Sequence, residues 1–154
     1  MKILALDLAT KTGWAHSVGV SGVWDFRVRK DESSGMRLLR FRSKLKEIHE
    51  LEGIDFVAYE TAIAVNARRG ATVGSEMQGV LKEWCESSDV DYKGYGISEI
   101  KRHATGKGNA SKDAMIEAAR IRFVEGCRFG VLGIVDDNHA DALWLLDLAT
   151  VELN

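Results

Sequence analysis

Two short apolar runs that each end in an acidic residue constrain the fold of this 154-residue chain most strongly. The run ILAL precedes Asp7, and the run FVAY precedes Glu60. Continuous apolar runs of this length are typical of buried strands in the middle of a sheet. A carboxylate directly after such a run is costly to bury unless it leaves the core or meets a cation. The pattern therefore predicts buried strands whose ends present acidic groups.

The remaining periodicity predicts helices around these strands. Apolar residues recur at three- and four-residue spacing from Leu38 to Leu51, which indicates an amphipathic helix with Gly53 as its C-cap. We expect strands at residues 2–7, 13–20, 22–28, 54–59 and 90–95, and further helices at 71–85, 111–124 and about 138–148. The first three strands should form a meander with a tight turn at Val20-Ser21-Gly22. Strands packed against intervening helices predict an α/β domain with a mixed sheet.

Length and composition favour one domain over residues 1–154. The sequence contains no run of about 18 apolar residues, so we expect no membrane span. Asp7 interrupts the N-terminal apolar run too early for a signal peptide, which predicts a cytoplasmic protein. Cys85 and Cys127 have neither CxxC spacing nor companions, so we interpret both as reduced thiols rather than zinc ligands.

Charge is distributed unevenly along the chain, although the net charge is only −2. Residues 27–46 contain eight Lys or Arg and two acids, whereas residues 125–154 contain six acids and one Arg. Such a chain can hold phosphates with one region and cations with another. Uneven charge is also common on solvated surfaces, so the pattern alone assigns no function.

A third acidic element precedes the last apolar helix. Asp137 and Asp141 are four residues apart and share one helical face, while Asp136 or Asn138 can serve as the N-cap. Asp141 lies a turn inside an otherwise apolar helix, so capping does not explain it. Inward acids from two strand ends and one helix would repel one another without a cation. Their hard oxygen atoms suit Mg²⁺ or Mn²⁺.

Four segments together resemble the RuvC-type Holliday junction resolvases of the RNase H-like superfamily. LALDLATKTGWA resembles the DxGxxxTG strand-turn of that family, and Glu60 matches the glutamate of its second acidic strand. EIKRHATGKGNASKDAM is similar to the VKxxxxGxGxAxK segment, and DDNHADALWL resembles the closing D-x-x-D-A helix. Order and spacing agree over nearly the whole chain, and the terse motif looks most like phage-encoded members.

The sequence departs from the family pattern at two positions. Ala9 replaces the glycine that often follows the first aspartate by two residues. Asn138 stands where the family usually has Asp or His, three residues before the last aspartate. The fourth site residue is therefore open among three neighbours, with Asp137 favoured over His139 and Asn138 third.

The resemblance implies an RNase H-like fold with a five-stranded mixed sheet, and a homodimer that nicks symmetric strands of a four-way DNA junction. The implied reaction is phosphodiester hydrolysis by a metal-activated water, which leaves 5′-phosphates. Asp7 would bridge two Mg²⁺ ions, and Glu60 and Asp141 would each hold one. Asp137 or His139 would assist as a ligand or orient the water.

Basic residues near the acidic elements are the candidates for DNA contacts. The resemblance assigns Lys101 and Lys112 to the two family lysines, and Lys107 lies between them in the same glycine-containing segment. Lys112 lies near the start of the helix expected at residues 111–124, so a phosphate there would also meet backbone N–H groups. Arg68 and Arg69 follow the Glu60 strand and look like junction contacts by position.

Three other functional classes remain open at this point. An RNase H-like nuclease acting on RNA or RNA–DNA hybrid would use the same acidic residues. A catalytically silent branched-DNA-binding module would not need them. An actin-like or sugar-kinase-like ATP-binding domain also opens with an acidic strand-turn, but 154 residues are few for two lobes and no second phosphate loop appears.

Overall fold

A five-stranded mixed sheet forms the centre of the molecule in the computed structural model, which describes residues 1–62 and 72–154. Its strands are β1 (Ile3–Asp7), β2 (Lys11–His16), β3 (Val20–Asp25), β4 (Phe56–Glu60) and β5 (Asp91–Tyr95). They are arranged in the order β3-β2-β1-β4-β5. The first three strands pair antiparallel, whereas β4 runs parallel to β1 and β5 runs parallel to β4. The mixed five-stranded sheet confirms the fold predicted from the sequence.

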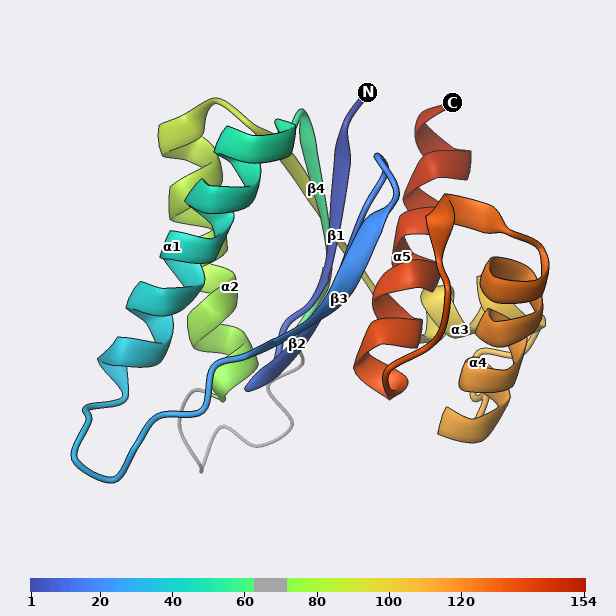
Figure 1. Cartoon of the computed structure of the whole chain (residues 1–154), viewed down its shortest axis with the longest axis horizontal. Helices are drawn as coiled ribbons and strands as arrows, with labels where there is room; N and C mark the ends of the chain where they lie inside the picture. The colour runs from blue at the N-terminus through green and yellow to red at the C-terminus, as the bar shows by residue number, and fades with distance from the viewer. Residues whose placement is uncertain (63–71) are drawn as a thin grey trace.

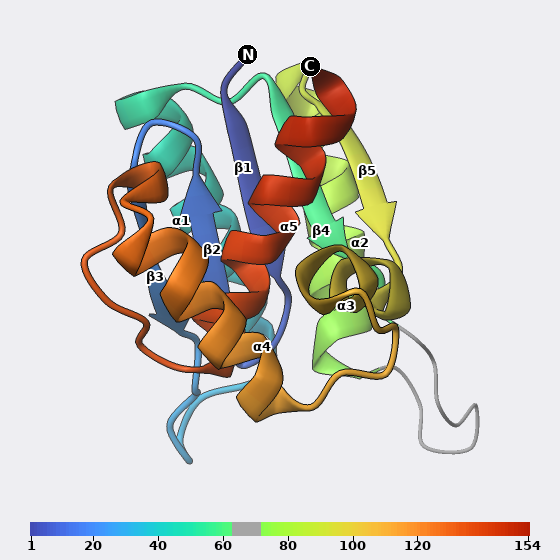
Figure 2. The same cartoon turned by 90° about the vertical axis from the view of Figure 1, so that its right-hand side faces the viewer.

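Helices cover both faces of the sheet (Figure 1). One face carries α1 (Gly35–Glu52) and α2 (Val73–Ser88). The other face carries α3 (Ile97–Thr105), α4 (Lys112–Ala119) and α5 (Asp137–Leu153), and α5 lies directly across β1 and β2 (Figure 2). Each layer has its own apolar core, and β1 contributes to both because Leu4 and Leu6 face α1 while Ile3 and Ala5 face α5. One sheet is therefore shared between two apolar cores.

The hairpin between β2 and β3 turns earlier than the sequence predicts. The expected turn at Val20-Ser21-Gly22 is wrong, because all three residues belong to β3. Gly19 makes the turn instead: its φ of +99° is a conformation that favours glycine, and its N–H donates to the His16 carbonyl over 3.0 Å. The apolar residues on either side do not reveal this register, because β3 is an edge strand with partly exposed side chains.

The helices on the α5 side also differ from the expectation. Residues 97–105 form α3, a helix that the sequence interpretation left out. The helix expected at residues 111–124 is regular only to Ala119 and continues as a π-helical turn, Arg120–Glu125. The last helix begins where expected but extends to Leu153 rather than to about residue 148.

A buried carboxylate joins the segments that pack on α5. Asp147 is 0% exposed and accepts hydrogen bonds from Arg122 Nε at 3.0 Å and His103 Nε2 at 2.9 Å, and Arg128 Nε lies 2.6 Å from it. Burial alone would raise the pKa of Asp147, but these hydrogen bonds and the charges of Arg122 and Arg128 bring it below its ordinary value. The aspartate therefore ties α3, the π-helical turn and the following loop to α5.

We expect Asp147→Ala to lower the free energy of unfolding by about 3 kcal/mol, because it removes the buried acceptor that Arg122, Arg128 and His103 share and leaves a small void in its place. Urea denaturation measures this loss. The matched control is Glu152→Ala on the same helix, whose partly exposed pair with Lys93 should contribute less than about 1 kcal/mol. Equal effects of the two substitutions would contradict a structural role for the Asp147 cluster.

Candidate active site

Acidic side chains from three elements gather at one end of the sheet. Asp7 is the last residue of β1 and Glu60 is the last residue of β4. These strands are parallel neighbours, and Leu6 pairs with Tyr59. Asp7 and Glu60 are the next residues of the two strands, so both lie at the same end of the sheet. The N-terminal turns of α5, which carry Asp137 and Asp141, lie at this same end in both views (Figures 1 and 2).

These carboxylates are half-buried, and partial burial and mutual repulsion raise the pKa values of three of them. Burial, followed by the charges of Glu60, Asp141 and Asp137, raises the pKa of Asp7 to about 8. Burial, followed by Glu60 and Asp137, raises the pKa of Asp141 to about 7. The pKa of Glu60 is raised mainly by burial, while the positive charge of Lys101 opposes the shift. The arrangement therefore disfavours several simultaneous negative charges unless a cation joins them.

The donor set fits a hard divalent cation by its chemistry, since carboxylate oxygens are the ligands that Mg²⁺ prefers. In the two described segments, 1–62 and 72–154, no group of three or more acids, imidazoles or thiols lies close enough to hold an ion as the side chains stand. The acids are near enough to repel but not closed to ligand distances. Binding of a cation would therefore require side-chain rotations within the cluster.

Two lysines lie beside the acids. Lys112 Nζ is 3.1 Å from Asp137 Oδ2, and the hydrogen bond to this carboxylate raises the pKa of Lys112. Lys112 is the first residue of α4, and the Ser111 hydroxyl caps that helix by accepting from the Ala114 N–H at 3.2 Å. Lys101 on α3 is close enough for its positive charge to oppose the upward pKa shifts of Glu60 and Asp141. The cluster thus combines four carboxylates with two ammonium groups.

His139 faces away from the acids toward β3. Its Nδ1 accepts from the Val135 N–H at 3.1 Å, so the proton is on Nε2, which lies 2.9 Å from the Ser21 hydroxyl. The side chain is 3% exposed, and burial lowers its pKa. Both ring nitrogens are therefore engaged in holding the start of α5 against the sheet. Asp136 provides the N-cap by accepting from the His139 N–H at 2.9 Å.

Gly13 on β2 allows α5 to approach the sheet. A Cβ built on Gly13 would lie 1.8 Å from the backbone oxygen of Asn138, which no side-chain movement can relieve. The start of α5, with its two acids, can reach the strand ends only because this position has no side chain. The Thr-Gly-Trp segment after Asp7 does not reveal this contact in the sequence, because it joins residues more than a hundred positions apart.

Gly13→Ala should therefore displace the start of α5, reduce stability by about 3 kcal/mol and reduce any activity that depends on Asp141. Thermal unfolding followed by circular dichroism tests the stability loss. Gly133→Ala is the control, because a Cβ there would meet no atom within 4 Å. If Gly13→Ala were as stable as the control, the close approach would not position α5.

Hydrogen bonds from neighbouring segments shape the turns that follow the two strand-end acids. After Asp7, the buried Thr12 hydroxyl donates to the Ala9 carbonyl at 2.7 Å. After Glu60, the Ala62 N–H donates to the Gln78 side chain on α2 at 3.1 Å. These contacts are not predictable from the sequence, since a lone threonine or glutamine carries no periodic signal.

The remaining predicted DNA-binding residues have different outcomes. Lys107 is exposed in the connection from α3 to α4, close to Gly106, whose φ of +79° closes α3. Lys107 is thus on the segment that joins Lys101 to Lys112, the two lysines that interact with the carboxylates. Arg68 and Arg69 lie outside the described residues.

In this sheet, two adjacent parallel strands each end in an acid, and the last helix contributes the remaining acids. This arrangement is RNase H-like. No protein-family model matches the sequence, and a search of curated proteins finds no similar sequence. Solved structures of RuvC and of a Holliday junction resolvase, however, are similar over nearly the whole chain.

Thermus thermophilus RuvC in complex with a Holliday junction substrate matches with a TM-score of 0.73 and 18% identity, covering 94% of this chain and 90% of that one. A second T. thermophilus RuvC structure matches with a TM-score of 0.69. The yeast mitochondrial Holliday junction resolvase Ydc2 matches with a TM-score of 0.59 and 10% identity, covering 93% of this chain and 75% of that one. The chain therefore has the RuvC-type fold that its motifs predict.

In the described parts of the chain, no helix combines the length and the apolar character that crossing a bilayer requires.

Proposed function

We propose that this protein is a metal-dependent endodeoxyribonuclease that resolves four-way DNA junctions by paired symmetric nicks. The observation that carries the proposal is the gathering of Asp7, Glu60, Asp137 and Asp141, with Lys101 and Lys112, at one end of a RuvC-type fold. The similar RuvC structure holds a Holliday junction, which supports branched DNA as the substrate class. Such a reaction would take place on cellular DNA in the cytoplasm.

The four carboxylates would hold Mg²⁺ or Mn²⁺, and Asp7 is the one whose pKa responds to the charges of the other three. When bound, the ions would lower the pKa of the attacking water and stabilise negative charge on the leaving 3′-oxygen, so that the product carries a 5′-phosphate. Glu60 and Asp141 would be ligands together with Asp7. Asp137 would be released from Lys112 as it turns toward the cluster.

Lys112 would then be free to contact the scissile phosphate. Its ammonium is exposed and is joined to the carboxylate cluster only through Asp137. A positive charge beside the phosphate stabilises the charge that builds on its oxygens during hydrolysis. Lys101 would remain beside Glu60, and Lys107 would contact the DNA backbone outside the reacting phosphate. Arg68 and Arg69 remain proposed junction contacts.

Lys112→Ala should reduce the single-turnover rate of junction cleavage about a hundredfold and weaken junction binding less than about fivefold. The physical reason is that the ammonium acts on charge present mainly in the transition state. Rates at saturating protein and gel-shift titrations in Ca²⁺ separate the two effects. Lys46→Ala, on an exposed position of α1, is the control. Equal losses in binding and rate would reassign Lys112 as an ordinary phosphate contact.

Paired nicks require two active sites, so the proposal includes a homodimer. Two glycines of α2 bear on where a second copy could contact this one. Gly74 is explained within one copy, because its Cβ would lie 3.1 Å from the Leu8 carbonyl oxygen. A Cβ on Gly79 would meet no atom within 4 Å, so this exposed position is available for contact with a second subunit. Sedimentation equilibrium measures whether the protein dimerises.

A panel of labelled substrates tests the proposed substrate class. A synthetic four-way junction, a linear duplex, a flap and an RNA–DNA hybrid are incubated with the protein in Mg²⁺ and in EDTA. We expect cleavage of the junction only, and only with Mg²⁺. Cleavage of the hybrid alone would assign the protein to the ribonuclease alternative, and metal-independent binding without cleavage would favour the silent DNA-binding module.

A further inference from the structure

Basic residues gather where the chain passes from β3 to α1. Lys11 begins β2 and pairs with Asp25, the last residue of β3, so both lie at the end of the sheet where β1 ends in Asp7. The connection that follows Asp25 extends past this end, at which α5 also begins (Figures 1 and 2). Lys11 and residues 25–40 together are called the basic surface below. It carries six basic and three acidic side chains, namely Lys11, Arg27, Arg29, Lys30, Arg37 and Arg40, and Asp25, Asp31 and Glu32.

The three acids of the basic surface are all paired with its own arginines. The pairs are Asp25 with Arg27 at 2.6 Å, Asp31 with Arg29 at 3.3 Å, and Glu32 with Arg40. Lys11, Lys30 and Arg37 have no acidic side chain within 4.0 Å among the residues that the structure describes. Both lysines are exposed. Three positive charges of this surface are therefore left without a partner.

The connection between β3 and α1 is held in place by its own contacts. Arg37 Nε donates to the Phe26 carbonyl at 3.1 Å, and the Glu32 carboxylate accepts from the Arg29 N–H at 2.8 Å. The buried Phe26 ring packs edge-on against Phe41 of α1, with the ring centroids 5.7 Å apart. A segment that is already ordered can bind a ligand without the ordering cost that a free loop would have.

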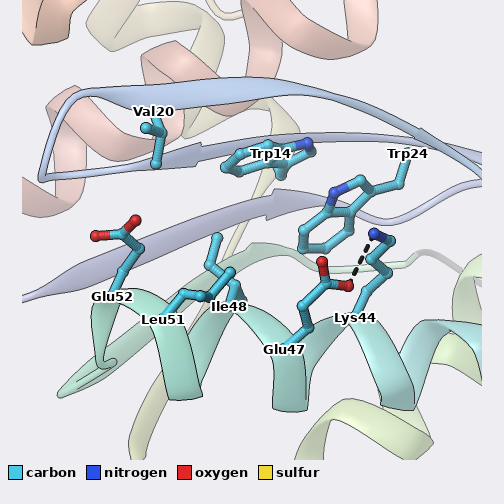
Figure 3. A pocket seen from close by; sticks show the side chains of 8 residues that line it. All are labelled: Trp14, Val20, Trp24, Lys44, Glu47, Ile48, Leu51 and Glu52. Carbon is cyan, nitrogen blue, oxygen red and sulfur yellow. Dashed lines mark hydrogen bonds and ion pairs between the residues drawn. The ribbon is translucent and has the colours of Figure 1, made fainter.

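The rest of α1 has no such surplus of positive charge. Its basic side chains beyond Arg40 each pair with an acid, Arg42 with Glu83, Lys44 with Glu47 and Lys46 with Glu50. Figure 3 shows the Lys44–Glu47 pair at an apolar hollow between α1 and the strands. The unpaired positive charge is therefore confined to the sheet end that carries the carboxylate cluster.

The basic surface lies close enough to this cluster for one DNA arm to contact both. β3 is the second strand from β1, and neighbouring strands are about 4.8 Å apart, so the two strand ends are separated by roughly 10 Å. B-DNA rises about 3.4 Å per base pair, so this separation corresponds to about three base pairs. Lys11 also shares a face of β2 with Gly13, against which the start of α5 packs.

We propose that Lys11, Lys30 and Arg37 bind the phosphate backbone of a junction arm within about three base pairs of the branch point. This inference rests on the nuclease function proposed above and adds a second region of DNA contact. Lys101 is on α3, which follows β5 at one edge of the sheet, whereas β3 forms the other edge. Cations would thus flank the carboxylate cluster on both sides. The basic surface would contribute affinity, and the residues of the cluster would carry out the hydrolysis.

The test is a binding titration of a four-way junction in Ca²⁺ over a range of salt concentrations. The double variant Lys11→Gln/Lys30→Gln removes two charges and keeps the Arg37 hydrogen bond, so the fold should persist. We expect its affinity to fall about tenfold, and the slope of log affinity against log salt to decrease in magnitude by about two, one for each lysine. An unchanged slope would overturn the proposal.

The matched control is Lys44→Gln/Lys46→Gln, which removes the same charge from the paired part of α1. Its affinity for the junction should change less than about twofold, because paired exposed lysines contribute little to a distant phosphate. Equal losses in the two double variants would mean that only net charge matters, and would also overturn the proposal.

Neutral methylphosphonates in the junction locate the contact. Placed within about three base pairs of the branch point, they should weaken binding of the unmodified protein but not of Lys11→Gln/Lys30→Gln, because the lost interaction is the same. Losses that add in full would place the two lysines away from these phosphates and contradict the proposal. Cleavage by the unmodified protein is measured separately in Mg²⁺. Cleavage together with unaltered binding by the double variant would refute this surface alone, whereas binding without cleavage would refute the nuclease function.

Discussion

Asp7→Asn is expected to reduce junction cleavage by a factor of at least about a thousand while junction binding stays within about threefold of the unmodified protein. The substitution removes the carboxylate that feels the charges of Glu60, Asp137 and Asp141 together, and therefore the group best placed to share two ions. The amide has almost the same shape, so the fold should persist. Single-turnover cleavage in Mg²⁺ and gel shifts in Ca²⁺ measure the two quantities.

Glu60→Gln and Asp141→Asn should have the same effect as Asp7→Asn. Glu60 ends β4 and Asp141 lies on α5, and both belong to the same carboxylate cluster as Asp7. Asp91→Asn is the matched control, since Asp91 is an exposed acid at the opposite end of the sheet, where β5 begins. Turnover retained by any of the three cluster variants would remove that residue from the proposed metal site.

The second large effect concerns stability without metal. In EDTA, the free energy of unfolding should fall as the pH rises from about 5 to 8. A carboxyl group whose folded-state pKa is raised stabilises the fold below its ordinary pKa, and that stability is lost as the pH rises through the raised value. The raised values here are about 8 for Asp7 and about 7 for Asp141. One pKa unit corresponds to about 1.4 kcal/mol, but both side chains are partly exposed and the solvent screens their charges, so we expect a loss on the order of only 3 kcal/mol.

Asp7→Asn should consequently stabilise the metal-free protein at pH 8 by about 1–3 kcal/mol, with a much smaller difference at pH 4.5. Mg²⁺ should reverse the order by stabilising the unmodified protein and leaving the variant nearly unchanged. Thermal unfolding at both pH values, with EDTA and with Mg²⁺, measures all four conditions. Equal stabilisation of both proteins by Mg²⁺ would place the bound ion away from Asp7.

The sequence predicts the strands that position the site because their signals are local. A buried central strand needs apolar residues on both faces, so β1 and β4 appear as short apolar runs, and their last residues are Asp7 and Glu60. The apolar face of α1 and its Gly53 cap are similarly local. The acids of α5 could be recognised because Asp141 is polar within an apolar helix.

Features that depend on contacts between distant residues were not predictable in this way. The close approach of Gly13 to Asn138 and the Ser21–His139 hydrogen bond appear only when α5 packs on β2 and β3. The turn at Gly19 was misplaced because the edge strand β3 lacks a clear alternation of buried and exposed residues. Asp147 shows no motif of its own, and its partners come from three separate segments.

Mapping the nicks on one synthetic four-way junction, with each strand end-labelled in turn, tests the central claim most directly. We predict that with Mg²⁺ the protein cuts two strands of like polarity at symmetric positions, that ligase can seal the products, and that EDTA abolishes the reaction. Unpaired cuts scattered over all four strands, or intact junctions at protein concentrations that saturate binding, would contradict the assignment as a junction-resolving nuclease.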